Sequence, residues 1–263
     1  MPTAVITGAS QGLGRAMARA LAGRGWSLIV DARHADQLTT AVTGLTAVTA
    51  IPGDVTDPAH RAAIGAAIGP AGRLDLLMNN ASRLGPSPQP ALRSYPLAEL
   101  GHVYETDVLA PLALFQVLAG PLTAAGGTVV NVSSDAATDA YPGWGGYGSA
   151  KAALDQLTAI LGAEEPGLRC YAFDPGDMRT AMHQHAFPGE DISDRPEPEV
   201  AAAALLRLLV QRPSSGRYRA SDYPETEAGL PPAAPQAPAA PQTPAAPQTP
   251  AAPQSQHSPA VAR

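Results

Sequence analysis

The sequence has 263 residues, of which 45% are hydrophobic and 15% charged, a formal net charge of −6 and a pI of about 5.4. This composition fits one globular domain with a sizeable core, and the lack of a long basic run argues against nucleic acid and anionic membranes as partners. Cys170 is the single cysteine, which excludes an intramolecular disulfide. Because the sequence also opens on a strand-like run rather than a signal sequence, we expect a cytoplasmic protein.

Two composition regimes meet near Tyr223. Residues 1–223 alternate short β-rich runs with Ala- and Leu-rich stretches, whereas residues 224–263 consist mainly of Pro, Ala, Gln and Thr with a recurring Pro-Ala-Ala-Pro-Gln unit. The second regime has few large apolar side chains to bury, so we expect a disordered tail with polyproline-II character, although a PxxP ligand is an alternative. One folded domain is therefore predicted over residues 1–223.

Strand-like and helical patterns alternate along that domain. The predicted strands are Thr3–Thr7, Ser27–Val30, Ala47–Ile51, Leu74–Met78, Thr128–Val132, Arg169–Phe173 and a weaker Gly216–Arg219. The predicted helices are Leu13–Arg24, Ala35–Thr43, Pro58–Ile68, Leu97–Leu118, Tyr147–Leu161 and Glu197–Val210. Alternation of this kind implies parallel strands joined by right-handed crossovers, and strands rich in Val, Ile and Leu are buried on both faces. We therefore predict an α/β fold with a Rossmann-type doubly wound parallel sheet of about seven strands and helices on both faces, which binds ligands beyond the carboxyl ends of the strands.

Two further segments carry weaker patterns. The longest apolar stretch, residues 108–125, contains Pro121, and we interpret it as a buried helix leading into a loop rather than a membrane span. Residues 181–196 are expected to form a lid or a disordered loop. His183 and His185 lie there without a third ligand pattern, so we predict surface or substrate-facing histidines and no metal site.

A glycine-rich loop follows the first predicted strand and opens into a helix. A tight turn at Gly8, close approach of backbone to a pyrophosphate at Gly12, and close packing of the helix at Gly14 would together present free N–H groups to a phosphate. A purely structural turn is the alternative, but the strand before and the helix after are the context that a dinucleotide site needs. The cofactor-binding residues predicted in this loop are Gly8, Ser10, Gln11, Gly12, Leu13 and Gly14.

The Gly-x-x-x-Gly-x-Gly spacing of that loop resembles the short-chain dehydrogenase/reductase family, in its compact single-domain branch, and the resemblance covers roughly residues 3 to 220. It implies that Asp54 and Val55 lie at the adenine ring. It also implies that Asn80 and Ala81, in the run Asn-Asn-Ala-Ser, lie against the cofactor, with Ser82 where the family has Gly.

The end of the second strand bears on the choice of nicotinamide cofactor. A carboxylate there can bind a ribose diol, whereas an arginine can pair with a 2′-phosphate. Aligned on the glycine loop, the family's NAD-selecting position falls at Ala32 and the next residue is Arg33. Asp31 lies one residue early and should point to the opposite face of the strand. We predict NADP, and a one-residue shift that returned Asp31 to the ribose would make NAD possible.

The proton-transfer residues are predicted on a later helix. Tyr147 and Lys151 stand at i and i+4, so they share one helix face. The ammonium should lower the pKa of the phenol, which could then give a proton to a carbonyl or take one from an alcohol. The family resemblance implies that Lys151 also bonds the nicotinamide ribose. It further implies that Ser134, thirteen residues before Tyr147, polarises the substrate carbonyl, with the adjacent Ser133 as an alternative.

One position departs from the family's pattern. Asp107 stands where the family commonly has an Asn that holds a water linked to the lysine. An ionised carboxylate accepts hydrogen bonds but cannot donate them, and beside Lys151 it would stabilise the ammonium and weaken the lowering of the tyrosine pKa. We include Asp107 among the catalytic residues. The alternative is a helix Asp that faces elsewhere.

The segment after the sixth strand resembles the family's Pro-Gly-x-x-x-Thr run. It implies backbone contacts from Pro175, Gly176 and Met178 to the nicotinamide amide, and a contact from Thr180 to pyrophosphate or amide. The apolar residues expected around the pocket favour an apolar or mildly polar small-molecule carbonyl or alcohol. These residues are Leu84, Tyr95, Tyr141, Trp144, Met178, Met182 and Phe187.

We therefore expect an NADP-dependent oxidoreductase. An isomerase or dehydratase using the same tyrosine is disfavoured, because such relatives usually carry a sizeable C-terminal substrate domain. A catalytically weak nucleotide-binding sensor is the second alternative, and Asp107 makes it conceivable. The helices at residues 97–118 and 147–161 resemble those through which family members assemble, so we expect a homodimer or homotetramer.

Overall fold

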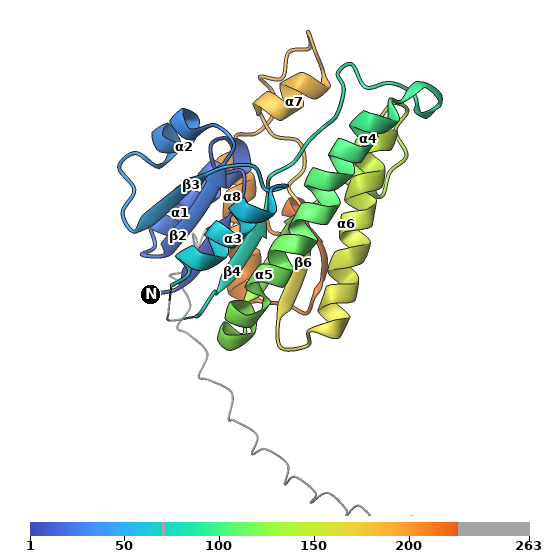
Figure 1. The fold of residues 1–263 in the computed structure, drawn as a ribbon. Coiled ribbons are helices and arrows are strands. Elements are labelled where there is room, and N and C mark those ends of the chain that lie inside the picture. The colour runs from blue at the N-terminus through green and yellow to red at the C-terminus, as the bar shows by residue number, and fades with distance from the viewer. Residues whose placement is uncertain (70–71, 226–263) are drawn as a thin grey trace, which may run out of the picture.

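The structure, a computed structural model, describes residues 1–69 and 72–225 (Figure 1). Only Pro224 and Glu225 of the segment expected to be a disordered tail fall within these residues. The rest of that expectation lies outside the described chain and stays a prediction.

The centre of the described chain is one sheet of parallel strands, which confirms the predicted Rossmann-type fold. The strands are β1 (Thr3–Ile6), β2 (Ser27–Ala32), β3 (Val48–Pro52), β4 (Leu76–Asn79), β5 (Thr128–Val132), β6 (Arg169–Asp174) and β7 (Gly216–Arg219). Their order is β3-β2-β1-β4-β5-β6-β7. The order reverses beside β1, between the crossover to β2 and the crossover to β4, and parallel sheets bind ligands at such a switch point.

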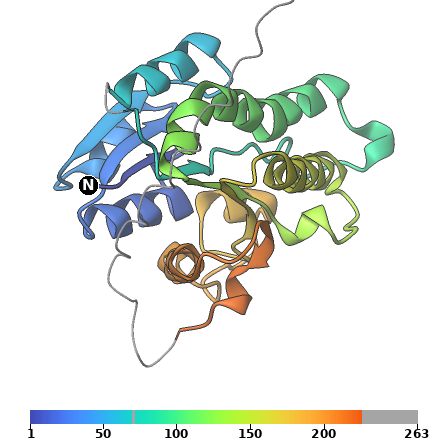
Figure 2. The same cartoon turned by 90° about the horizontal axis from the view of Figure 1, so that it is seen from below.

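Helices cover both faces of this sheet, as Figure 2 shows from below. They are α1 (Gly12–Ala22), α2 (Ala35–Val42), α3 (Pro58–Ala67), α4 (Leu97–Tyr104), α5 (Ala110–Ala125), α6 (Gly145–Glu164), α7 (Ala181–Ala186) and α8 (Pro198–Gln211). One core layer packs α1, α2 and α8 on the sheet, with Met17, Leu38 and Leu205 fully buried. The other packs α3, α5 and α6, with Ile64 and Leu118 at its centre. Successive strand residues feed opposite layers, which is why the strands are apolar on both faces.

The run from Leu97 to Ala125 differs from the prediction of a helix followed by a loop. It stays helical through Pro121 to Ala125, with a π-helical segment at Glu105–Leu109 between α4 and α5. The helix survives because Leu118 and Leu122 are buried in the core, while the Pro121 carbonyl accepts the N–H of Leu74 at 3.0 Å. By length and composition the run could cross a membrane. In this fold its apolar side packs on β4 and α3.

The expected lid also contains a helix that the sequence did not predict. The short α7 begins after Thr180, whose hydroxyl accepts the N–H of His183 at 3.1 Å and so caps the helix. The segment after β4 is tied to the lid by the Ser87 hydroxyl, which donates to the His185 carbonyl at 2.6 Å.

Candidate active site

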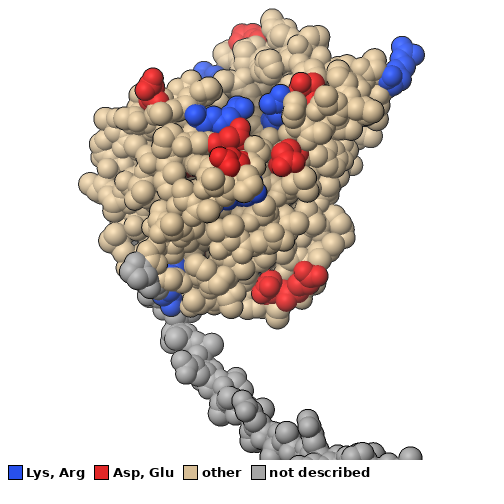
Figure 3. Space-filling view, in the orientation of Figure 1, with Lys and Arg blue, Asp and Glu red and all other residues tan. Residues whose placement is uncertain are grey.

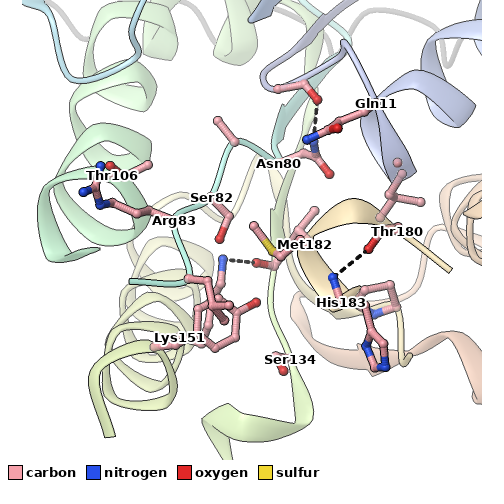
Figure 4. A pocket seen from close by; sticks show the side chains of 18 of the residues that line it. Gln11, Asn80, Ser82, Arg83, Thr106, Ser134, Lys151, Thr180, Met182 and His183 are labelled. Atoms are coloured by element: carbon pink, nitrogen blue, oxygen red, sulfur yellow. Dashed lines mark hydrogen bonds between the residues drawn. The ribbon is translucent and has the colours of Figure 1, made fainter. Parts of the chain in front are cut away.

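A cavity of about 580 Å³ opens beyond the carboxyl ends of β1, β2, β4, β5 and β6 (Figure 4). Of the residues predicted to bind the cofactor or to catalyse, all but Gly14 and Asp107 line it. Gly14 lies behind the glycine loop, and Asp107 is fully buried behind the cavity wall. The structure thus brings the predicted residues together from segments more than one hundred and sixty residues apart in the sequence, such as Gly12 and Thr180.

The glycine loop has the geometry that a bound pyrophosphate requires. Gly8 and Gly12 take positive φ angles of 66° and 53°, which favour glycine. A Cβ atom on Gly14 would lie 2.6 Å from the Gly8 carbonyl oxygen, so only glycine fits there. The Asn80 amide donates to the carbonyls of Thr7 and Gly8, at 2.9 and 3.1 Å, and fixes the loop to the end of β4. No side chain caps α1, so its first N–H groups remain available to an anion.

Asp31 and Arg33, at the end of β2, differ in burial and in the partners they contact. Asp31 is buried: Oδ1 accepts the N–H of Gly8 at 2.8 Å, and Oδ2 lies 3.0 Å from Nε2 of His60. Burial raises the pKa of Asp31, although its hydrogen bonds to His60 and Gly8 act in the opposite direction. Ala32 packs into the opposite core layer, as alternation along the strand predicts. The Oδ1 oxygen of Asp31 is therefore engaged by the glycine loop, and its Oδ2 oxygen by His60.

Arg33 and Asp54 stand at the outer part of the cavity, and both are exposed. Asp54 accepts the backbone N–H and the hydroxyl of Thr56 at 2.9 and 2.8 Å. Partial burial works to raise the pKa of Asp54, but these bonds and the charge of Arg33 outweigh it, and the pKa is lowered. Arg33 makes no ion pair within residues 1–69 and 72–225.

Tyr147 and Lys151 project from α6 into a buried corner of the cavity. Nζ of Lys151 donates to the Val132 carbonyl at 3.0 Å and lies 5.4 Å from the centroid of the Tyr147 ring. The lysine side chain is only 2% exposed. Figure 4 shows Lys151 beside Ser82, with Ser134 at the end of β5. A buried ammonium next to a phenol is an arrangement suited to proton transfer.

Asp107 contacts this corner from the π-helical segment. Its Oδ2 lies 3.7 Å from Nζ of Lys151 and accepts the Ser82 hydroxyl at 2.9 Å, while Oδ1 accepts the N–H of Arg83 at 2.7 Å. Asp107 therefore faces Lys151 rather than pointing elsewhere. Burial works to lower the pKa of Lys151, but Asp107 outweighs it and the pKa is raised.

The pKa of the Tyr147 phenol departs from the expectation that Lys151 would lower it. Burial raises the pKa, Lys151 opposes that rise, and Asp107 adds to it. The spacing of Tyr147 and Lys151 indicated the neighbouring ammonium but not the desolvation of the phenol. Desolvation has the larger effect on the pKa of Tyr147.

Ser134 ends β5 at the cavity, but its hydroxyl also has local partners. It donates to Asp135 Oδ1 at 2.8 Å, and its oxygen accepts the N–H of Ala136 at 3.2 Å. A substrate carbonyl at this hydroxyl would have to take the hydrogen now directed at Asp135. Ser133 is buried, and its hydroxyl points to the Ser134 carbonyl at 3.5 Å.

Aromatic rings form the wall next to Tyr147. The Trp144 ring lies 5.9 Å from that of Tyr147 and 5.7 Å from that of Phe187, between ring centroids. Phe187 in turn packs on His183 at 4.9 Å. The segment after α7 is therefore held over the catalytic corner by aromatic contacts.

Sequence reasoning missed Arg217 on β7. Its guanidinium donates to the Ser134 carbonyl at 2.8 Å, to Asp174 Oδ2 at 3.1 Å and to Asp155 Oδ2 at 2.9 Å. Asp174 also accepts the N–H of Gly176 at 3.0 Å. Arg217 thus joins the serine end of β5 to the loop after β6, a connection between distant segments that no local pattern marks.

Comparison with known proteins gives concordant matches. The family model of short chain dehydrogenases matches residues 2–191. Sepiapterin reductase of Rattus norvegicus is 34% identical over 199 residues, covering 69% of this chain and 76% of that protein. The 2-(R)-hydroxypropyl-CoM dehydrogenase of Xanthobacter autotrophicus is 32% identical over 217 residues, covering 77% and 87%.

Solved structures agree with these matches. An alcohol dehydrogenase from the archaeon Thermococcus sibiricus, complexed with 5-hydroxy-NADP, superposes with a TM-score of 0.74 at 28% identity, covering 83% of this chain and 95% of that one. A short-chain dehydrogenase from Streptomyces avermitilis superposes with a TM-score of 0.74 at 28% identity, covering 84% and 90%.

Proposed function

The chain belongs to the short-chain dehydrogenase family of oxidoreductases, and we propose that it transfers a hydride between NADP(H) and a carbonyl or alcohol, with Tyr147 as general acid and base. The observation that carries the proposal is the buried Tyr147–Lys151 pair in the same cavity as the glycine loop. Nothing in the described residues favours the alternative of a nucleotide-binding sensor.

The cradle of the glycine loop and the open N-terminus of α1 fit the pyrophosphate of a dinucleotide. When bound, the reduced nicotinamide supplies the hydride. Tyr147 supplies the proton to the substrate oxygen, and Lys151, held by the Val132 carbonyl, keeps a positive charge beside the phenol. Ser134 orients the substrate carbonyl once its hydrogen turns from Asp135. The burial of this corner strengthens each of these electrostatic contacts.

NADP is proposed over NAD on two observations. Arg33 lines the cavity without an ion-pair partner in the described chain, and its guanidinium can pair with a 2′-phosphate. Asp31, the carboxylate that could select NAD, is buried and bonded to Gly8 and His60. The similarity to an alcohol dehydrogenase complexed with 5-hydroxy-NADP gives further support.

We propose an uncharged, apolar or mildly polar substrate. The wall near Tyr147 presents Trp144 and Met182, and the arginine at this end of the cavity, Arg83, is paired with Glu99 at 3.0 Å. A phosphate or carboxylate on the substrate would have to break that pair. An aromatic wall whose nearby arginine is already paired instead suits a carbonyl compound bound through apolar contact.

A cytoplasmic homodimer or homotetramer is proposed for the assembly. Leu109 and Val117 on the α4–α5 run, and Ile160 on α6, are exposed large apolar side chains. Figure 3 shows few charged side chains on the surface over α5 and α6. Apolar surface of this kind is typical of a subunit contact.

The test of the proposed function is a panel of uncharged aldehydes and ketones with NADPH and NADH in parallel, followed by the loss of absorbance of the reduced cofactor. We expect carbonyl-dependent oxidation of NADPH, and slower oxidation of NADH. Direct binding of NADPH, measured by fluorescence, is the control. Tight NADPH binding with no turnover across a broad panel would contradict the proposal and favour the sensor.

A further inference from the structure

Arg217 on β7 carries a guanidinium that reaches the carboxyl end of β5, two strands away. The parallel register pairs Arg217 with Ala172 on β6, so the two side chains lie on the same face of the sheet. The small alanine leaves room for the longer side chain to cross β6. At the end of β5, Nη2 of Arg217 donates to the Ser134 carbonyl at 2.8 Å. The edge strand of the sheet thus contacts the residue expected to orient the substrate.

Ser134 needs such a contact because it lies just beyond the paired part of β5. The bond from the Ser133 N–H to the Phe173 carbonyl, at 2.8 Å, comes at the end of that strand. The Ser134 carbonyl then accepts the N–H of Ala137 at 3.1 Å within its own segment, and Arg217 provides its bond to another strand. Holding this carbonyl fixes the ψ angle of Ser134, and with it the direction in which the hydroxyl leaves the backbone.

Two carboxylates hold the guanidinium in place. Nε of Arg217 donates to Asp155 Oδ2 at 2.9 Å, and Nη2 donates to Asp174 Oδ2 at 3.1 Å. The arginine side chain is 23% exposed and the two carboxylates 15% and 5%, so these ion pairs are largely shielded from solvent. Because a guanidinium is planar and donates in fixed directions, its position is determined by all three acceptors together.

One of these carboxylates belongs to the helix of the proton-transfer pair. Asp155 lies on α6 four residues after Lys151, which is about one helical turn. The guanidinium of Arg217 therefore joins the Ser134 peptide to the helix that carries Tyr147 and Lys151. Neither Arg217 nor Asp155 lines the cavity, so neither reaches a substrate bound there. Any effect of Arg217 on the reaction must pass through the residues that it holds.

We infer that Arg217 is a positioning residue: it fixes the Ser134 peptide relative to α6, so that the Ser134 hydroxyl and the Tyr147 phenol meet at one substrate oxygen. The inference deepens the proposed function and rests on it for its catalytic meaning. Two groups that bond the same oxygen must be held at a set separation, and a displacement of about 1 Å can cost ~10²-fold in rate. Arg217 limits that displacement from outside the cavity.

Arg217→Lys tests the inference while it keeps a positive charge between Asp155 and Asp174. A single ammonium cannot present the planar fork, so the tie to the Ser134 carbonyl should be lost while the protein stays folded. On a carbonyl that the parent reduces, we expect kcat to fall by about 10- to 100-fold. The KM for the carbonyl and the Kd for NADPH should stay nearly constant, because the serine bond strengthens only as negative charge develops on the substrate oxygen.

The matched control is Arg207→Lys. Arg207 is a buried arginine on α8 that donates to the Tyr223 carbonyl at 2.9 Å and does not line the cavity, so its substitution should leave kcat unchanged. The decisive comparison is Arg217→Lys in a Ser134→Ala background, where no hydroxyl is left to position. There the substitution should change kcat by less than about 2-fold. The same loss of kcat in both backgrounds would overturn the inference, because Arg217 would then act independently of Ser134.

Hydrogen exchange tests the tie without substrate or turnover. The Ala136 N–H is bonded within the segment that Arg217 holds, to Ser134 Oγ and Asp135 Oδ1. Peptides covering residues 133–138 should exchange faster in Arg217→Lys than in the parent, and at the parent's rate in Arg207→Lys. Unchanged exchange in Arg217→Lys would overturn the inference whatever the turnover. A parent that reduces no carbonyl would instead count against the proposed function, which the carbonyl panel reports separately.

Discussion

The two ends of the cavity are built by different means. The cofactor end consists of backbone and exposed side chains: the glycine loop presents N–H groups, and Arg33 and Asp54 are open to solvent. The catalytic end consists of buried ionisable side chains, with Asp107 at 0% and Lys151 at 2% exposure. Backbone geometry and glycine spacing determine the first. Burial and charge balance determine the second.

Asp54 and Asp107 lie at opposite ends of the cavity and differ in burial. Partial burial of Asp54 is outweighed by its bonds to Thr56, and its pKa is lowered, whereas full burial of Asp107 outweighs even the charge of Lys151, and its pKa is raised. An aspartate is thus an exposed group at the cofactor end of the cavity and a buried group beside Lys151 at the catalytic end. Substitutions at the catalytic end should therefore change both stability and chemistry, while those of the exposed side chains at the cofactor end should change affinity alone.

The largest effect that follows from this comparison is that of Lys151→Met. It leaves Asp107 as an uncompensated buried charge, so the free energy of unfolding should fall by about 3–5 kcal/mol, and turnover should fall by ~10²-fold or more. Denaturant unfolding and NADPH oxidation are the measurements. The double variant with Asp107→Asn should recover part of the stability but not the turnover. Equal stability of Lys151→Met and the parent would mean that the buried pair is not coupled.

Arg33→Ala tests the cofactor end of the cavity, where we expect a change in cofactor affinity and none in stability. It should weaken NADPH binding by about 1.5–3 kcal/mol, or about 10- to 150-fold in Kd, while NADH binding and the melting temperature stay nearly constant. Arg93→Ala removes the same charge from an exposed residue outside the cavity and is the matched control. An equal loss for both cofactors would show that Arg33 does not read the 2′-phosphate, and would leave NAD as the better candidate.

The smallest effect is expected for the Pro- and Ala-rich segment. Removing residues 226–263 should change neither the melting temperature nor the turnover, because its composition offers few large apolar side chains to bury. Calorimetry and the NADPH assay on the shortened chain measure this. A clear drop in either would show that the segment contacts one of the two ends of the cavity or the body that carries them.

The contrast between the two ends of the cavity also explains how much of the fold and of the site the sequence predicted. All seven strands and the glycine loop were recognisable, because period, β-branching and glycine spacing are local signals. Pro121 misled the prediction, because a proline signals a helix end locally while burial of Leu118 and Leu122 kept the helix intact. The π-helical segment that places Asp107 has no comparable local signature.

Part of the catalytic end was therefore beyond sequence reasoning. The Tyr147–Lys151 spacing predicted that these side chains meet, and the structure places them together. The sign of the tyrosine pKa shift could not follow from spacing, because desolvation depends on how tightly α6 packs on its neighbours. Arg217 and Ser82 contact their partners across 83 and 25 residues of sequence, respectively, and only the fold reveals them.

The proposed function depends above all on Tyr147 as the proton donor of a nicotinamide-dependent reaction. Its most direct test is NADPH oxidation by Tyr147→Phe on a carbonyl that the parent reduces, together with NADPH binding to the same variant. We expect a loss of turnover of ~10²–10⁴-fold with NADPH affinity nearly unchanged, because the hydroxyl is lost while the ring still packs on Trp144. Turnover close to that of the parent would contradict the assignment of Tyr147.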